Sequence, residues 1–186
     1  MKLVSLLLML VLTACASTVI EPTYYLMRAD DGLQSRKLTP SSDFVLGNVV
    51  IASYIDQHGL VIETSDGVMR AAQHHLWAEP VYEGVRNQLT VKIAQATGED
   101  LLPAKLGVGK IVLDIEINQL HGTDQGTAKL VAYWLLRQGD KVLSAYQFAE
   151  QQPLTTSGYS ALVAAEGVLL EKLAREIAAT LVKSPD

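Results

Sequence analysis

Candidate nucleophiles and acids occur at two places in the sequence. Ser160 stands in the stretch Gly-Tyr-Ser-Ala-Leu, but a hydrolase nucleophile turn would need a second glycine at position 162 and a strand in front of the serine. Asp114 and Glu116 are two residues apart, which on a strand places both side chains on one face, about 7 Å apart, as paired catalytic carboxylates can be. Their neighbours in the sequence do not form an apolar pocket. A solvated strand face is therefore the favoured interpretation of this pair.

Metal and phosphate binding have little support. His74 and His75 are adjacent, and neighbouring residues of an extended chain point to opposite sides, whereas metal ligands must converge. The stretch Gly107-Val108-Gly109-Lys110 lacks the first glycine of a phosphate loop and leads into a strand instead of a helix. We therefore expect no metal, no cofactor and no enzymatic activity.

The single cysteine, Cys15, has the clearest chemical role. Residues 1–14 combine Lys2, a long apolar run and two small residues, which is the plan of a secretory signal peptide. The apolar run is shorter than the roughly 20 residues that a membrane-spanning helix needs. Leu12-Thr13-Ala14-Cys15 resembles the bacterial lipobox, whose cysteine is lipidated and becomes the new N-terminus. We predict lipidation of Cys15, with ordinary cleavage beside an incidental thiol as the alternative.

The mature chain is expected to be one acidic domain held near a membrane. Removing residues 1–14 leaves 172 residues and a formal charge of −6, because Lys2 is the one charged residue lost. This charge disfavours nucleic-acid binding. Ala16 differs from the aspartate that signals inner-membrane retention, so we expect an anchor in the outer membrane, on its periplasmic face. Residues 15–22 form the lipidated N-terminus and tether, and residues 23–186 form the periplasmic domain.

Strands are predicted on both sides of a central helix. Short strands are expected at residues 24–28 and 44–52, followed by a hairpin whose turn is Ser65-Asp66-Gly67. After the helix, residues 111–118 alternate apolar and polar side chains, which is typical of a half-buried strand. Strands at 127–137 and 142–150 follow through short turns, and three such strands predict an antiparallel meander.

Two helices are predicted to cover the sheet. The first begins at Pro80, ends at Gly98 and repeats an apolar residue every four positions. The second extends from Tyr159 to Lys183 with an apolar stripe on one side. Because each apolar helix face needs a sheet face for cover, we expect an α+β fold: a single mixed or antiparallel sheet with two main helices packed on one face.

Three stretches resemble a known family. They are Thr23–Met27 (TYYLM), Val49–Asp56 (VVIASYID) and His74–Val81 (HHLWAEPV), and they resemble the PqiC/YmbA family of ABC-type transport auxiliary lipoproteins. The resemblance implies a domain similar to the N-terminal domain of TolB, anchored in the outer membrane. It further implies an auxiliary role in a PqiABC-like MCE system for intermembrane lipid transport. The partner would be a PqiB-like MCE protein that bridges the periplasm.

Candidate partner-binding residues come from the same stretches. They are Tyr54, Asp56, Trp77 and Glu79. Trp77 suits a binding hot spot, but it equally suits the core beside the helix start. A homo-oligomer is expected if the partner is a symmetric ring. The alternatives to a docking role are a carrier that encloses a lipid acyl chain and an envelope assembly factor.

Overall fold

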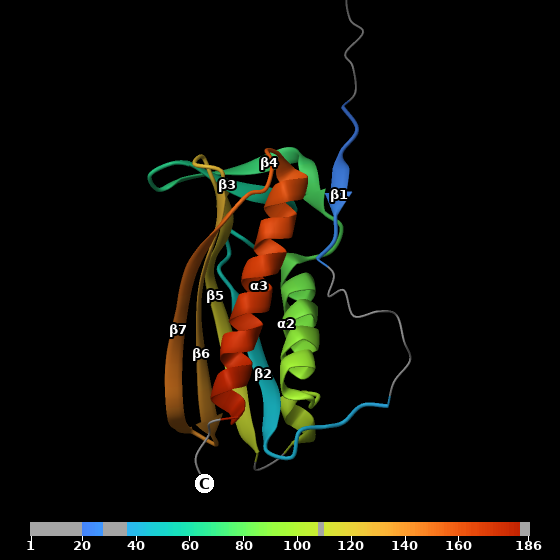
Figure 1. Cartoon of the computed structure of the whole chain (residues 1–186), viewed down its shortest axis with the longest axis vertical. Coiled ribbons are helices and arrows are strands. Elements are labelled where there is room, and N and C mark those ends of the chain that lie inside the picture. The colour runs from blue at the N-terminus through green and yellow to red at the C-terminus, as the bar shows by residue number, and fades with distance from the viewer. Residues whose placement is uncertain (1–19, 28–36, 108–109, 183–186) are drawn as a thin grey trace, which may run out of the picture.

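The computed structural model describes residues 20–27, 37–107 and 110–182. In it, the alternating apolar residues at 111–117 lie at the centre of a seven-stranded sheet (Figure 1). They belong to β5 (Ile111–Thr123). On one side of β5 lie β6 (Thr127–Gln138) and then β7 (Lys141–Pro153), each antiparallel to its neighbour, which confirms the predicted meander. On the other side, β2 (Phe44–Ile51) pairs in parallel along the first half of β5.

The remaining strands join the sheet at the last residues of β5. There β3 (Gly59–Ser65) pairs in parallel with β5 and forms an antiparallel hairpin with β4 (Val68–Trp77). The last strand, β1 (Thr23–Tyr25), pairs in parallel with β4. The sheet is therefore mixed. β1 is shorter than the expected strand at 24–28, whose last residue lies outside the described ranges.

Two helices, α2 (Val81–Thr97) and α3 (Tyr159–Val182), lie on the same face of the sheet (Figure 1). The four-residue repeat of α2 is buried, and Gly98 ends this helix with a φ of 77° in the left-handed region. The turn η1 (Ala104–Leu106) precedes β5. The predicted α+β architecture is confirmed. The apolar repeat of each helix is buried at every position. Its residues are Val81, Val85, Leu89 and Ile93 in α2, and Leu162, Ala165, Leu169, Leu173, Ile177 and Leu181 in α3.

A bulge in β5 changes which residues face the helices. The pairing of β5 with β6 shifts between Ile117 and Gln119, so one extra residue is inserted in β5. Before the bulge the odd-numbered residues point toward the helices. After it, Gly122 lies against the side chain of Leu162 in α3, and His121 is turned to the opposite face.

The predicted export signal and anchor lie outside the described residues. Cys15, residues 1–14 and all but the last three residues of the proposed tether belong to that part of the chain. Their boundaries stay predictions. Within residues 20–27, 37–107 and 110–182, neither helix combines the length and apolar character required of a membrane span.

Candidate functional site

The sheet face opposite the helices presents apolar side chains to solvent. Residues that are paired across neighbouring strands share a face, so Val50, Glu116, Tyr133 and Gln147 form one row across β2, β5, β6 and β7. Val50 is 53% exposed and Tyr133 is 41% exposed, although both are large apolar side chains. Because α2 and α3 both cover the other side, this row remains open (Figure 1). We call it, with its neighbours Asp114, Leu135 and Ala145, the open sheet face.

A shallow groove of about 290 Å³ crosses the open sheet face. Val50 and Tyr133 border it, and Asp114 and Glu116 contribute carboxylates. The hydroxyl of Tyr133 accepts a hydrogen bond from Gln147 Nε2 at 2.9 Å, which fixes the ring in place. The arrangement is an apolar surface with a few fixed polar groups, which suits binding to a protein better than catalysis.

The two carboxylates on this face have separate partners. Asp114 accepts hydrogen bonds from Arg137 Nε at 2.5 Å and from the backbone N–H of Asn48 at 2.7 Å. Glu116 accepts one from Asn118 Nδ2 at 3.2 Å. A Cβ at Gly47 would stand 2.1 Å from Asp114 Oδ1, so the absence of a side chain there allows β2 to approach this carboxylate. The expected shared face is confirmed, but these contacts leave Asp114 structural.

Tyr54 covers a buried polar cluster at the end of β5. Its ring meets His121 edge-on at a centroid distance of 6.0 Å, and His121 is 3% exposed. His121 Nε2 lies 4.0 Å from Glu63 Oε2, and neither ring nitrogen has a hydrogen-bond partner among the described residues. Burial lowers the pKa of His121, with Glu63 acting in the opposite direction, and burial together with Glu63 raises the pKa of Tyr54. The bulge in β5 creates this cluster, which sequence periodicity does not reveal.

The other candidate partner-binding residues lie in different environments. Asp56 is exposed, Glu79 is half-buried, and Trp77 is 7% exposed within the core. The backbone N–H of Trp77 donates to the backbone oxygen of His58 at 2.7 Å, and His58 follows the Val49–Asp56 stretch by two residues. Trp77 therefore supports the join between strand and helix in this chain. Partner binding by Tyr54, Asp56, Trp77 and Glu79 stays a prediction.

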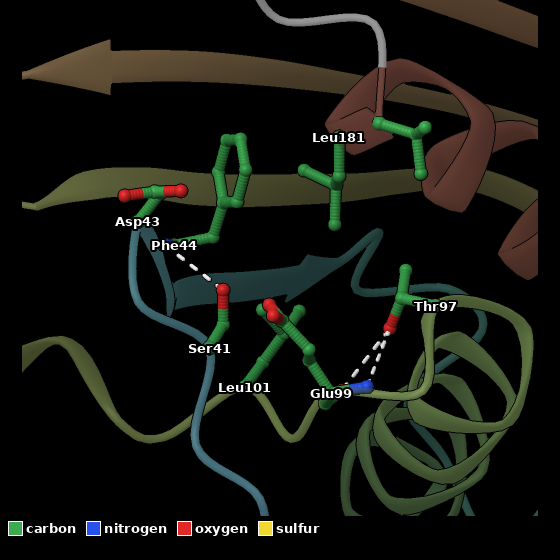
Figure 2. Close-up of a pocket in the computed structure, with 8 residues that line it drawn as sticks. Ser41, Asp43, Phe44, Thr97, Glu99, Leu101 and Leu181 are labelled. Atoms are coloured by element: carbon green, nitrogen blue, oxygen red, sulfur yellow. Dashed lines mark hydrogen bonds between the residues drawn. The ribbon is translucent and has the colours of Figure 1, made fainter.

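A second pocket, of about 230 Å³, lies where the chain enters β2, near the ends of both helices (Figure 2). Its hydroxyls are engaged internally: Ser41 Oγ accepts from the Phe44 N–H at 3.3 Å, and Thr97 Oγ1 accepts from the Glu99 N–H at 3.2 Å (Figure 2). The carboxylates of Asp43 and Glu99 also line this pocket. Among the described residues, no cluster of three or more His, Cys, Asp and Glu side chains forms a metal-binding group. Ser160 lies in the first turn of α3, in agreement with the helix predicted to begin at Tyr159.

One buried acid lies outside these sites. Glu166 on α3 is 3% exposed, and its Oε2 has no hydrogen-bond partner within the described chain. Burial raises the pKa of Glu166 from its ordinary 4.5 to about 8, so the carboxyl is protonated at neutral pH. The sequence analysis missed this residue, because an acid inside an otherwise apolar helix stripe carries no motif.

The family model for the ABC-type transport auxiliary lipoprotein component matches residues 24–178. The chain belongs to this family. Intermembrane transport lipoprotein PqiC of Escherichia coli (strain K12) is 26% identical over 177 residues, which cover 94% of each chain. PqiC of Shigella flexneri matches with the same identity and coverage. The resemblance found in the three motif-bearing stretches is confirmed.

Solved structures show the same fold. A crystal structure of an uncharacterised protein superposes with a TM-score of 0.74 at 20% identity, covering 87% of this chain and 99% of the other. A crystal structure from Xanthomonas campestris gives a TM-score of 0.68 at 15% identity, covering 86% of this chain and 95% of the other. The mixed sheet with two helices on one face is therefore also the architecture of these two proteins.

Proposed function

We propose that this lipoprotein is anchored by Cys15 in the outer membrane, on its periplasmic face, and that it docks the MCE-type protein of an intermembrane lipid transport system. Family membership supports the auxiliary role, and the likeness to PqiC supports intermembrane transport. The single observation that carries the docking role is the open sheet face. Val50 and Tyr133 expose apolar surface there, on the side of the sheet that α2 and α3 leave uncovered.

The open sheet face is also suited to protein recognition by its chemistry. Tyrosine is enriched at protein interfaces because its ring contributes apolar area and its hydroxyl a hydrogen bond. Tyr133 presents such a ring in the same row as Val50, with Glu116 between them, and the Asp114–Arg137 pair adds charge nearby. A partner that covers this row would remove exposed apolar area from water, which is the main source of binding free energy.

Native co-purification from membranes tests the docking role. We expect Val50→Asp to reduce recovery of the MCE-type protein by about tenfold or more, because it places an unpaired charge in a contact that becomes buried. Val168→Asp is the matched control, since Val168 is 42% exposed on α3, away from the open sheet face. Recovery that is equal in wild type and Val50→Asp, or equally reduced in both variants, would contradict this use of the face.

The anchor is tested separately. The mature protein should weigh more than bare polypeptide by the mass of its acyl groups, and Cys15→Ser should release the chain from the outer-membrane fraction. An unlipidated native mass would refute the anchor and leave the docking measurement unaffected.

We also infer a homo-oligomer. β7 stands at the end of the strand order, and no described strand pairs with its outer edge, so the outward-pointing N–H and C=O groups of this 13-residue strand are available to a second copy. Light scattering on the mature protein should give a mass that is a multiple of the single chain. A monomeric mass across the micromolar range would contradict this inference.

A further inference from the structure

A groove of about 740 Å³ lies beside the β3–β4 hairpin. Its lining comes from separate parts of the chain: Ile20 before β1, Ile62 and Thr64 on β3, residues 70–75 on β4, and Tyr159 at the start of α3. Figure 1 shows β1, the hairpin and the start of α3 at the same end of the molecule. None of these residues belongs to the open sheet face.

One wall of this groove is held rigidly. The ring of His75 stacks on Tyr159 at a centroid distance of 4.1 Å and an interplanar angle of 21°. His75 Nδ1 also shares a hydrogen bond of 3.0 Å with the hydroxyl of Tyr25 in β1. These contacts join β1, β4 and α3, so the wall is fixed before any ligand arrives.

The groove combines apolar surface with the cationic side chain of Arg70. Ile20, Ile62 and Tyr159 provide apolar area, whereas Arg70 and His74 are exposed and carry nitrogen donors. No acidic residue is among those that line it, although the mature chain has six more acidic than basic residues. The guanidinium of Arg70 forms no ion pair with any described residue, so its donors are available to an anion.

The position of the groove along the chain brings it near a membrane. Ile20 follows Cys15 by five residues, and an extended chain of that length spans at most about 18 Å. If Cys15 carries the anchor, the groove lies close to the headgroup layer, which is roughly 5–7 Å thick on each side of the bilayer. This step rests on the lipid anchor of the proposed function.

We propose that this groove binds the headgroup of an anionic phospholipid from the anchoring membrane, with Arg70 on the phosphate and Ile62 and Tyr159 against the glycerol and upper acyl chain. A guanidinium donates two parallel hydrogen bonds to a phosphate, and such charge-assisted bonds are the stronger kind. The contact would hold the β3–β4 end of the domain against the bilayer, and it would use none of the residues of the open sheet face.

Native mass spectrometry of the mature protein in detergent tests this site. Phosphatidylglycerol is titrated against wild type, Arg70→Gln and Lys105→Gln, and phosphatidylcholine and inorganic phosphate are the comparison ligands. Lys105 is an exposed lysine on η1 outside the groove, so Lys105→Gln is matched in charge. We expect one tight phosphatidylglycerol adduct, at least fivefold weaker phosphatidylcholine binding, and a loss of about fivefold in affinity for Arg70→Gln alone.

Three results would overturn the proposal: equal binding of the two phospholipids, unchanged binding by Arg70→Gln, or an equal loss in both variants. Binding of inorganic phosphate as tight as that of phosphatidylglycerol would also overturn it, since the apolar wall would then contribute nothing. Equal urea midpoints for the three proteins establish that each is folded. The bare mass of an unlipidated chain would refute the anchor instead, so failure of the site and failure of the proposed function are distinguishable.

Discussion

Glu166→Gln is expected to stabilise the protein at neutral pH and to have little effect in acid. The folded chain holds the pKa of Glu166 at about 8, and the ordinary value is 4.5. Between these values the unfolded chain has lost its proton while the folded chain keeps it, so the free energy of unfolding falls as pH rises. Each pH unit costs about 1.4 kcal/mol, which gives a penalty of roughly 3 kcal/mol at pH 7 relative to pH 4.5. Glutamine is neutral in both states and avoids this penalty.

Urea unfolding at pH 4.5 and pH 7, followed by the fluorescence of buried Trp77 and Trp134, measures this difference. The stability of Glu166→Gln relative to wild type should rise by about 3 kcal/mol between the two pH values. The control is Glu83→Gln, which changes an exposed acid on α2 and should show no such rise. The reasoning is refuted if the stability difference between Glu166→Gln and wild type is the same at both pH values.

Three further variants probe the packing described above. Gly47→Ala places a Cβ against Asp114 and should lower the unfolding free energy by about 1–3 kcal/mol in urea; an unchanged midpoint would show that β2 can move away. Ile177→Ala opens a cavity at a fully buried position of α3 and should cost about 2–5 kcal/mol in the same assay, more than Val168→Ala at an exposed one. His121→Leu should make the protein less sensitive to acid below pH 6.5, because the lowered pKa of His121 means that the unfolded chain takes up protons first; parallel pH profiles of thermal unfolding for wild type and variant would contradict this.

Local patterns were sufficient to predict most elements of the fold. The repeat of Val81, Val85 and Leu89 predicted α2 because an amphipathic helix must bury one stripe, and Gly98 ended it where a left-handed residue was needed. The alternation along β5 predicted a half-buried strand for the same reason of burial. The parallel pairing of β5 with β2 and β3 could not be predicted in this way, because it joins segments that are far apart in the chain.

The candidate sites were less accessible to such patterns. Trp77 has the side chain of an interface residue, yet its location is in the core, since residue type does not report which surface a neighbouring element covers. His121 lies in a strand whose alternation is broken by one inserted residue, so its burial depends on the bulge beside Gln119. Arg70 and Tyr159 border one groove only because α3 begins beside the β3–β4 hairpin.

By itself, the sequence determined the periodic elements, the turns between them and the motif around Cys15, because each of these depends on residues that are close along the chain. Tertiary structure alone decided that Val50 and Tyr133 share an uncovered face, that Glu166 is buried without a partner for Oε2, and that Arg70 is free of ion pairs with the described residues. These features depend on which distant segments exclude water from one another. Exposure and charge pairing are therefore properties of the assembled fold and not of any short stretch.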